Sequence, residues 1–213
     1  MSEPLTLTSL PLFPLGTALF PAGRLPLRVF EVRYLDMIGK CQRAGAPFGV
    51  VALAQGSEVR VAGAPPEQLQ AVGTLAHIEQ LGQPQPGLMT LVARGEQRFR
   101  IDRQHRLPHG LWVADVTLLP LDPTVAVPDD LQPAANALRQ LHERVAAQPP
   151  EDVPAGVLVA GDAAYDDCGW VANRWAELLP LPLATRYQLL TLDNPLIRLG
   201  LVADMLARAG ISA

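Results

Sequence analysis

The sequence predicts an α+β protein in which a β-rich N-terminal domain with one helix precedes a C-terminal α-helical bundle. In the first part of the chain, short apolar segments alternate with turns rich in glycine and proline. Beyond a proline-interrupted stretch at 120–128, the apolar residues recur at helical spacing. The charge changes at the same place: residues 1–125 hold 11 basic and 10 acidic residues, whereas residues 126–213 hold 6 and 11. We therefore expect two domains, 1–122 and 129–213, joined by a linker at about 120–128.

The opening run, residues 10–30, alternates prolines and glycines with large apolar side chains. Because proline lacks the N–H that a central strand needs, this run predicts short edge strands joined by tight turns. Together with the later strands, it favours a partly closed β barrel or a folded-over sheet. Four of its apolar side chains are expected to fill the interior: Leu12, Phe13, Leu27 and Phe30.

One helix is predicted inside the β domain, over residues 31–44. Its apolar residues recur at helical spacing from Val32 to Cys41, and Gly45 suits the C′ position. Glu31 is expected to cap the helix start or to pair with a nearby arginine. Tyr34 is expected to be half-buried, with its hydroxyl at the surface.

Five further strands follow the helix, with a loop rich in glycine, proline and glutamine at 55–70. Gly95 allows a bulge or sharp bend between two of them. In the segment after Gly95, the alternation places Phe99 on one side and Arg98 and Arg100 on a solvated side. The expected strands are 48–53, 72–78, 88–94, 98–101 and 111–119.

Four helices are predicted after the linker. Asp129 or Asp130 can cap the first, which runs to about Gln148 and carries His142 on its polar side. Asp166 or Asp167 can cap the second, which Pro180 ends, and Pro182 can begin the third. Asn194 and Pro195 form a cap and N1 pair for the last helix, which Gly210 closes.

The sequence holds no motif for nucleotide-driven or proteolytic chemistry. Lys40 is the single lysine and is followed by Cys41, so no G-x-x-x-x-G-K-[ST] loop and no serine–lysine protease pair is present. Cys41 and Cys168 are too few to form a zinc site. His105 and His109 are four residues apart, a spacing that could bind a metal on a helix, but they lie in a predicted turn. We expect no enzyme activity, no cofactor and no metal.

The composition points to a globular chain of the cytoplasm. Hydrophobic residues make up 49% of it, and the formal charge of −4 is too small to indicate a nucleic-acid or membrane partner. The start of the chain has no basic region of the kind that opens a secretory signal.

Several ordered segments resemble the Lon protease N-terminal (substrate-binding) domain family, and together they span almost the whole chain. The segments are the opening run at 10–34, Phe48-Gly49-Val50-Val51, Val72-Gly73-Thr74-Leu75-Ala76-His77-Ile78, Gly95-Glu96-Gln97-Arg98-Phe99-Arg100-Ile101, Leu178-Leu179-Pro180 and Leu192-Asp193-Asn194-Pro195-Leu196-Ile197-Arg198-Leu199. The resemblance implies a six-stranded pseudo-barrel with one helix and then a helical bundle. It also implies a role in recognising unfolded or tagged proteins.

We therefore expect a non-enzymatic module that binds exposed apolar segments, at a groove near the rim of the β domain or at a crevice against the helices. Edge strands could also accept a peptide by strand addition, although proline weakens that mode. The candidate peptide-binding residues are Phe20, Leu25, Tyr34, Trp112, Trp170 and Trp175. Phe20, Pro21 and Leu25 are expected to be exposed at the groove.

Three other functions stay open at this point. The chain could be an adaptor or regulatory subunit that docks onto a protease or another assembly, and co-purification with one folded partner would distinguish it. A cryptic hydrolase has no supporting constellation of serine, cysteine and histidine. A small-molecule-binding role is the third.

Overall fold

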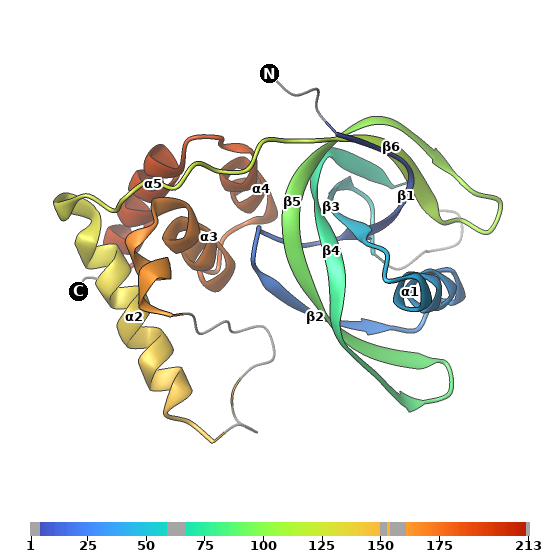
Figure 1. Cartoon of the computed structure of the whole chain (residues 1–213), viewed down its shortest axis with the longest axis horizontal. Helices are drawn as coiled ribbons and strands as arrows, with labels where there is room; N and C mark the ends of the chain where they lie inside the picture. Colours follow the sequence, from blue (N-terminus) through green and yellow to red (C-terminus); the bar gives the residue numbers. More distant parts are fainter. Residues whose placement is uncertain (1–4, 59–66, 150–152, 154–160, 212–213) are drawn as a thin grey trace. The chain divides into compact units, whose positions relative to one another are not determined.

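The computed structural model describes residues 5–58, 67–149, 153 and 161–211 (Figure 1). The chain divides into two compact units, Met1–Leu121 and Asp122–Ala213, which we term the first and second units. Within the described residues, the first unit contains one six-stranded sheet and helix α1 (Val32–Ala44), and the second contains four α-helices. The α+β class is confirmed. None of the helices in the described ranges is long and apolar enough to cross a membrane.

The sheet has the strand order β2-β5-β4-β3-β1-β6, and β5 also pairs with β6, so the hydrogen-bonded pairings return to β5 and close a ring (Figure 1). Only β1 and β3 are parallel, and every other pair is antiparallel. The strands are β1 (Thr6–Leu15), β2 (Arg24–Val29), β3 (Phe48–Gln55), β4 (Gln68–Gln85), β5 (Leu88–Arg106) and β6 (Trp112–Leu118).

Strand β5 is one continuous strand, so the prediction of two strands separated at Gly95 is wrong. Gly95 stays in the ladder and bonds to the turn before β2: its N–H donates to the Gly23 carbonyl and its carbonyl accepts from the Ala22 N–H. A Cβ at this position would lie 2.3 Å from the Phe20 carbonyl oxygen. The glycine therefore permits a close approach of two backbones rather than ending the strand.

Strand β1 lies between β3 and β6, so its prediction as an edge strand is wrong. Its prolines are tolerated because each lies where β1 has a partner on one side only. Pairing with β6 covers the part from Thr6 to Leu12, which includes Pro11, and pairing with β3 covers the part from Leu12 to Leu15, which includes Pro14. Strand β2 is a true edge strand and pairs with β5 alone.

The core of the first unit forms two buried clusters. The first gathers side chains from β1, β3 and β5 under the buried face of α1, and the second contains Leu12 and Phe99 between β1, β3 and β6. Val29 is buried at the end of β2, whereas the next residue, Phe30, is 54% exposed and Leu27 is only partly buried. The expectation that Phe30 fills the interior is wrong, because successive residues of an extended chain point to opposite sides.

Helix α1 begins and ends as its sequence predicts. Gly45 follows it in the left-handed conformation (φ 58°), and its N–H donates to a carbonyl of the last turn. Glu31 precedes the helix without a side-chain cap and instead pairs with Arg33. Tyr34 is 3% exposed, so the expectation that it is half-buried is wrong.

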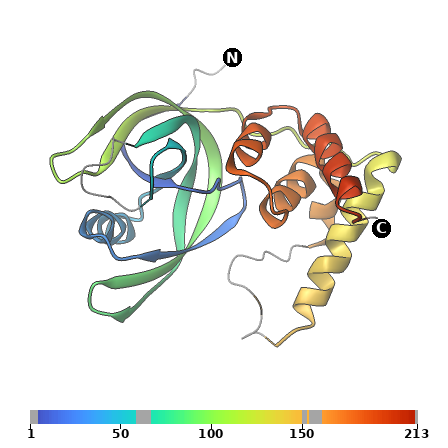
Figure 2. The same ribbon diagram turned by 180° about the vertical axis from the view of Figure 1, so that it is seen from behind.

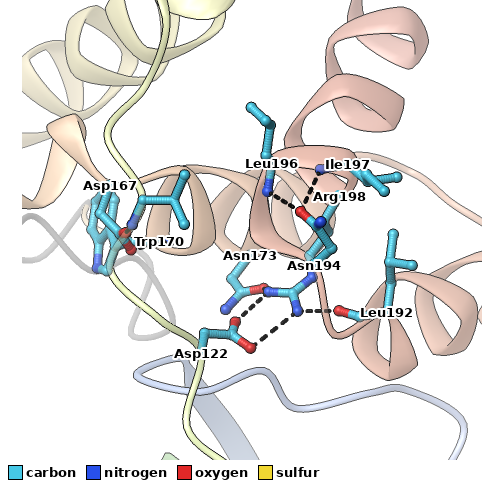
Figure 3. Close-up of polar contacts among 10 residues, drawn as sticks. Asp122, Asp167, Trp170, Asn173, Leu192, Asn194, Leu196, Ile197 and Arg198 are labelled. Atoms are coloured by element: carbon cyan, nitrogen blue, oxygen red, sulfur yellow. Dashed lines mark hydrogen bonds and ion pairs between the residues drawn. The ribbon is translucent and has the colours of Figure 1, made fainter.

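In the second unit, two polar residues cap helices as expected. Asp167 accepts the N–H of Trp170, and Asn194 accepts the N–H groups of Leu196 and Ile197 (Figure 3). The elements are η1 (Asp129–Leu131), α2 (Gln132–Ala146), η2 (Asp162–Asp166), α3 (Cys168–Leu178), α4 (Leu183–Thr191) and α5 (Pro195–Arg208).

Two expectations about helix α2 are wrong. Leu131 stands at its N-cap without a side-chain bond, and Asp129 and Asp130 belong to the short η1 turn instead. His142 is buried rather than on a polar side, and its Nδ1 lies 2.9 Å from the Tyr165 hydroxyl. Tyr165 packs against His142 and buries this face of α2. The spacing of residues within α2 does not predict this contact.

Candidate functional site

A pocket of about 230 Å³ lies in the first unit, at the start of α1. Figure 2 shows β2 leading into this helix. The end of β1, strand β2 and the first turn of α1 supply most of the lining, and one further residue comes from the segment after β3. The lining residues are Phe13, Leu15, Pro26, Leu27, Arg28, Val29, Phe30, Glu31, Tyr34 and Glu58.

The floor of the pocket is aromatic. The Phe13 and Tyr34 rings stack with centroids 4.2 Å apart and planes 22° apart, and the Arg33 guanidinium lies 4.5 Å from the centre of the Tyr34 ring. Burial raises the pKa of Tyr34, and the positive charge of Arg33 offsets only part of that effect. The phenol is therefore protonated at neutral pH.

An ion-pair network around the buried Arg33 holds the start of α1. Arg33 is 6% exposed, and its Nη2 lies 3.0 Å from the Glu31 carboxylate. Its Nη1 donates to the Gly110 carbonyl at 2.9 Å and lies 3.8 Å from Glu67, which also pairs with Arg106 at 3.1 Å. Arg33 thus ties α1 to the β5–β6 turn, which gives it a positioning role rather than a chemical one.

The rim of the pocket is charged. Glu58 and Arg28 are exposed and Glu31 is half-buried, so two carboxylates and one guanidinium line the opening. The Gly16 N–H donates to the Glu58 carboxylate. Since Arg33 already offsets the charge of Glu31, Glu58 is the carboxylate most available to a bound cation.

Of the six predicted site residues, only Tyr34 lines this pocket. Phe20 is fully buried, so the expectation of an exposed Phe20 is wrong. Leu25 and Pro21 are half-buried, and Leu25 packs against the first core cluster. Trp112 is half-buried on β6, with the Arg106 guanidinium 6.0 Å from the centre of its ring.

The other two predicted residues lie on α3 in the second unit. Trp175 is buried, and its indole N–H donates to the Ala134 carbonyl at 2.9 Å. Trp170 is half-buried and packs edge-on against Tyr165, with ring centroids 5.0 Å apart. Both indoles are thus engaged in packing within the helices.

The sequence reasoning missed most of the pocket. The sequence predicts Pro26, Arg28 and Val29 only as parts of edge strands, and Glu58 falls in the segment that it predicts to be a loop. One signal was available in the sequence, the alternation of side chains along an extended chain. If the Val29 side chain points inward, the side chain of the next residue, Phe30, points outward. No local signal places Glu58 at the same pocket as β2, because β2 and Glu58 are far apart in the sequence.

A second polar cluster surrounds Arg198 on α5 (Figure 3). Its guanidinium pairs with Asp122 at 2.5 Å and donates to the Asn173 side chain at 3.0 Å and to the Leu192 carbonyl. The side chain is 1% exposed, and these partners neutralise its charge. This cluster fastens the chain at Asp122 to α3 and α5.

The described residues contain no group of three or more histidine, cysteine or acidic side chains that could hold a metal ion. Burial raises the pKa of both thiols, those of Cys41 and Cys168, and therefore suppresses the reactive thiolate form. The chemistry that the pocket itself can supply is hydrogen bonding, apolar contact and charge pairing.

Three comparisons with known proteins agree with this architecture. The sequence pattern of the ATP-dependent protease La (Lon) substrate-binding domain matches residues 9–208. The crystal structure of a Lon N-terminal domain protein from Xanthomonas campestris is 33% identical, with a TM-score of 0.67, and the match covers 93% of this chain and 98% of that one. The N-terminal domain of the Lon protease of the Mycobacterium avium complex shares the fold at 20% identity, with a TM-score of 0.58 over 92% of this chain and 96% of that one.

Lon protease 2 of Herpetosiphon aurantiacus is 28% identical over 193 residues. The match covers 88% of this chain, which spans 22% of the length of that relative. The family pattern runs through both units, from β1 to the end of α5. This chain therefore belongs to the family of Lon substrate-binding domains.

Proposed function

We propose that this chain is a non-enzymatic recognition module that binds exposed apolar segments of unfolded or tagged proteins. The observation that carries the proposal is the pocket between β1, β2 and α1, where a half-exposed Phe30 adjoins a floor of stacked aromatic rings. Val32, two residues after Phe30, is also exposed, at 72%. Clustered exposed apolar side chains on a soluble domain favour a binding role.

The closed ring of strand pairings supports the further proposal that the first unit is the pseudo-barrel typical of the family, and that the helices of the second unit form its bundle. A closed ring leaves β2 as an added strand beside β5. The rim of such a barrel is a common place for a binding site.

Binding is tested by fluorescence anisotropy with a labelled model protein, presented denatured or native and without ATP. We expect preference for the denatured form with micromolar affinity, which corresponds to about −8 kcal/mol. Phe30→Ser should weaken this binding, whereas Leu81→Ser should not, because Leu81 is a partly exposed residue of the same unit outside the pocket. Equal binding of both forms, or equal effects of both substitutions, would contradict the proposal.

An adaptor role that docks onto a folded partner is the second candidate, and the face of α5 favours it. Leu196, Ile197 and Leu201 are 41%, 53% and 44% exposed on this helix. Pull-down of one folded partner that Ile197→Ser abolishes, without preference for denatured protein, would select this role over the first.

A further inference from the structure

The free edge of β2 carries an inference that rests on the proposed function and deepens it. Strand β2 pairs with β5 from Arg24↔Arg94 to Val29↔Met89 without a register shift. No other strand of the described chain pairs with β2. One edge of β2 therefore presents backbone groups that the sheet does not use.

The hydrogen bonds next to β2 identify which groups these are. The Gly95 N–H donates to the Gly23 carbonyl, and this pair continues the register of β2 and β5. Along an antiparallel strand, the backbone N–H and C=O groups of alternate residues point to the same edge. The backbone groups of Leu25, Leu27 and Val29 therefore point toward β5, as the Gly23 carbonyl does. The backbone groups of Arg24, Pro26 and Arg28 then face the free edge.

The position of Pro26 agrees with this direction of the backbone groups. The register runs unbroken through Pro26↔Val92, so the ring nitrogen of Pro26, which carries no hydrogen, does not serve the ladder with β5. Proline at such a position is a common protection of an edge strand against unselective pairing. It leaves the Pro26 carbonyl and both backbone groups of Arg28 available.

This edge borders the pocket. Four consecutive residues of β2, from Pro26 to Val29, line the pocket. Since successive side chains of a strand point to opposite faces, a lining by consecutive residues means that the strand presents its edge, and not one face, to the pocket. Outside the β2–β5 ladder, the described residues give no hydrogen bond to the backbone of Pro26 or Arg28.

The lining chemistry identifies the occupant. Six of the lining side chains are apolar, and the charged lining residues are two carboxylates and one guanidinium, with Glu58 exposed. We propose that an extended peptide segment pairs with the free edge of β2 at Arg28, places an apolar side chain in the pocket, and sets a neighbouring lysine or arginine against Glu58. Main-chain bonds of this kind bind many sequences, whereas the pocket and Glu58 select among them.

Peptides with N-methylated backbones test the strand pairing. For a labelled peptide with a leucine–lysine centre, methylation at the positions that face β2 should weaken binding about threefold to tenfold each, the value of one lost hydrogen bond. Methylation at the intervening positions should not weaken binding, so the loss of affinity should recur at every second residue of the peptide. Uniform effects, or none, would overturn the pairing. If only the strand pairing is wrong, the preference for denatured protein and the effect of Phe30→Ser should remain. Failure of the strand pairing is therefore distinguishable from failure of the proposed function.

Amide exchange by NMR gives a second readout in the intact protein. Addition of the peptide should slow exchange of the Arg28 N–H, which faces the free edge. The Leu27 N–H, which the ladder with β5 already holds, should change little. An Arg28 amide that exchanges equally fast in the saturated complex would overturn the proposal.

Restoring the missing donor makes a positive test. Pro26→Ala adds one N–H at the free edge and should tighten peptide binding about threefold to tenfold. Pro108→Ala, at an exposed proline of the β5–β6 turn, is the matched control and should leave affinity unchanged. A folded Pro26→Ala variant with unchanged affinity would contradict pairing at this edge.

Charge reversal tests the role of Glu58. Glu58→Lys should weaken the leucine–lysine peptide and strengthen the corresponding leucine–glutamate peptide, so that the order of the two affinities inverts. Glu143→Lys, which makes the same change at an exposed position of α2, should preserve the order. An unchanged order in Glu58→Lys would remove Glu58 from the site.

Discussion

Phe99 illustrates how single residues decide packing in the first unit. It is fully buried, and Gly73 on the neighbouring strand β4 and Gly49 on β3 make room for its ring. A Cβ at Gly49 or Gly73 would lie 2.8 Å or 2.6 Å from the Phe99 Cζ. Real Cβ atoms do not approach ring carbons this closely, so the small residues and the large one form one packing unit.

Gly73→Ala should therefore destabilise the protein by about 1–3 kcal/mol, because the Phe99 ring and the Val50 carbonyl leave no space for a methyl group. Gly200→Ala is the matched control, since nothing lies within 4 Å of its Cβ position on α5, and it should stabilise the helix by about 0.5–1 kcal/mol. Urea unfolding followed by circular dichroism measures both. Changes of the same sign would refute the packing argument.

We expect the titration of His142 to affect the stability of the protein. Burial lowers its pKa, and the nearby Arg174 adds to that shift. Its ring contacts Tyr165 and Trp170, and Arg139 and Arg174 lie over those two rings. The neutral imidazole is therefore the native form, and protonation favours the unfolded chain, in which histidine titrates at a pKa of about 6.5.

The stabilising contribution of neutral His142 is present above a pH of about 6.5 and is lost progressively as the pH falls below it. We expect the midpoint of urea unfolding to fall between pH 7 and pH 5, and His142→Gln to reduce this dependence. His105→Gln, at an exposed histidine, is the control substitution. An identical slope in His142→Gln and the unsubstituted protein would contradict the assignment.

At the scale of elements, the segment that follows the β sheet is bound closely to the helices. The Val125 N–H donates to Asp167, the Cys168 N–H donates to the Val125 carbonyl, and Ala126 forms a bridge with Asp167. Asp122 pairs with the buried Arg198 of α5. Short-range caps start these helices, and the contacts of this segment then hold their ends together.

Arg198→Met should destabilise the protein by about 3–5 kcal/mol, because the substitution leaves Asp122 without its buried partner. Arg208→Met, on the last turn of the same helix and exposed, should cost less than about 0.5 kcal/mol. Thermal unfolding compares the two variants. A small loss of stability in Arg198→Met would show that solvent or another group can pair with the Asp122 carboxylate.

At the scale of the whole molecule, the connection between the two units is short. The Leu119 N–H donates to the Arg98 carbonyl and its own carbonyl accepts from Gln97, so Leu119 is held by β5. Asp122 is held by α5. Only Pro120 and Leu121 lie between these two anchors, and each unit carries its own buried side chains.

A fragment of residues 1–121 should fold and bind the leucine–lysine peptide with the affinity of the full chain, because every lining residue of the pocket lies between Phe13 and Glu58. A fragment of residues 122–213 should not bind it. Isothermal titration of both fragments measures this. A folded first fragment with at least tenfold weaker binding would assign part of the site to the second unit.

Local interactions explain what the sequence determined by itself. Gly45, Asp167 and Asn194 mark helix ends because their backbone or side-chain preferences act within one turn. The helices, most strands and the family followed from such patterns. Tyr34, one of the six residues predicted for a binding site, lines the pocket, and its role there stays a prediction.

Only the tertiary structure decided which strands pair and what their edges face. Strand β1 lies inside the sheet, β5 is continuous through Gly95, Phe20 is buried whereas Phe30 is exposed, and Glu58 lines the same pocket as β2. Each outcome depends on contacts between segments far apart in the chain, whereas sequence patterns report the preferences of neighbouring residues. The pocket exists because those distant segments meet.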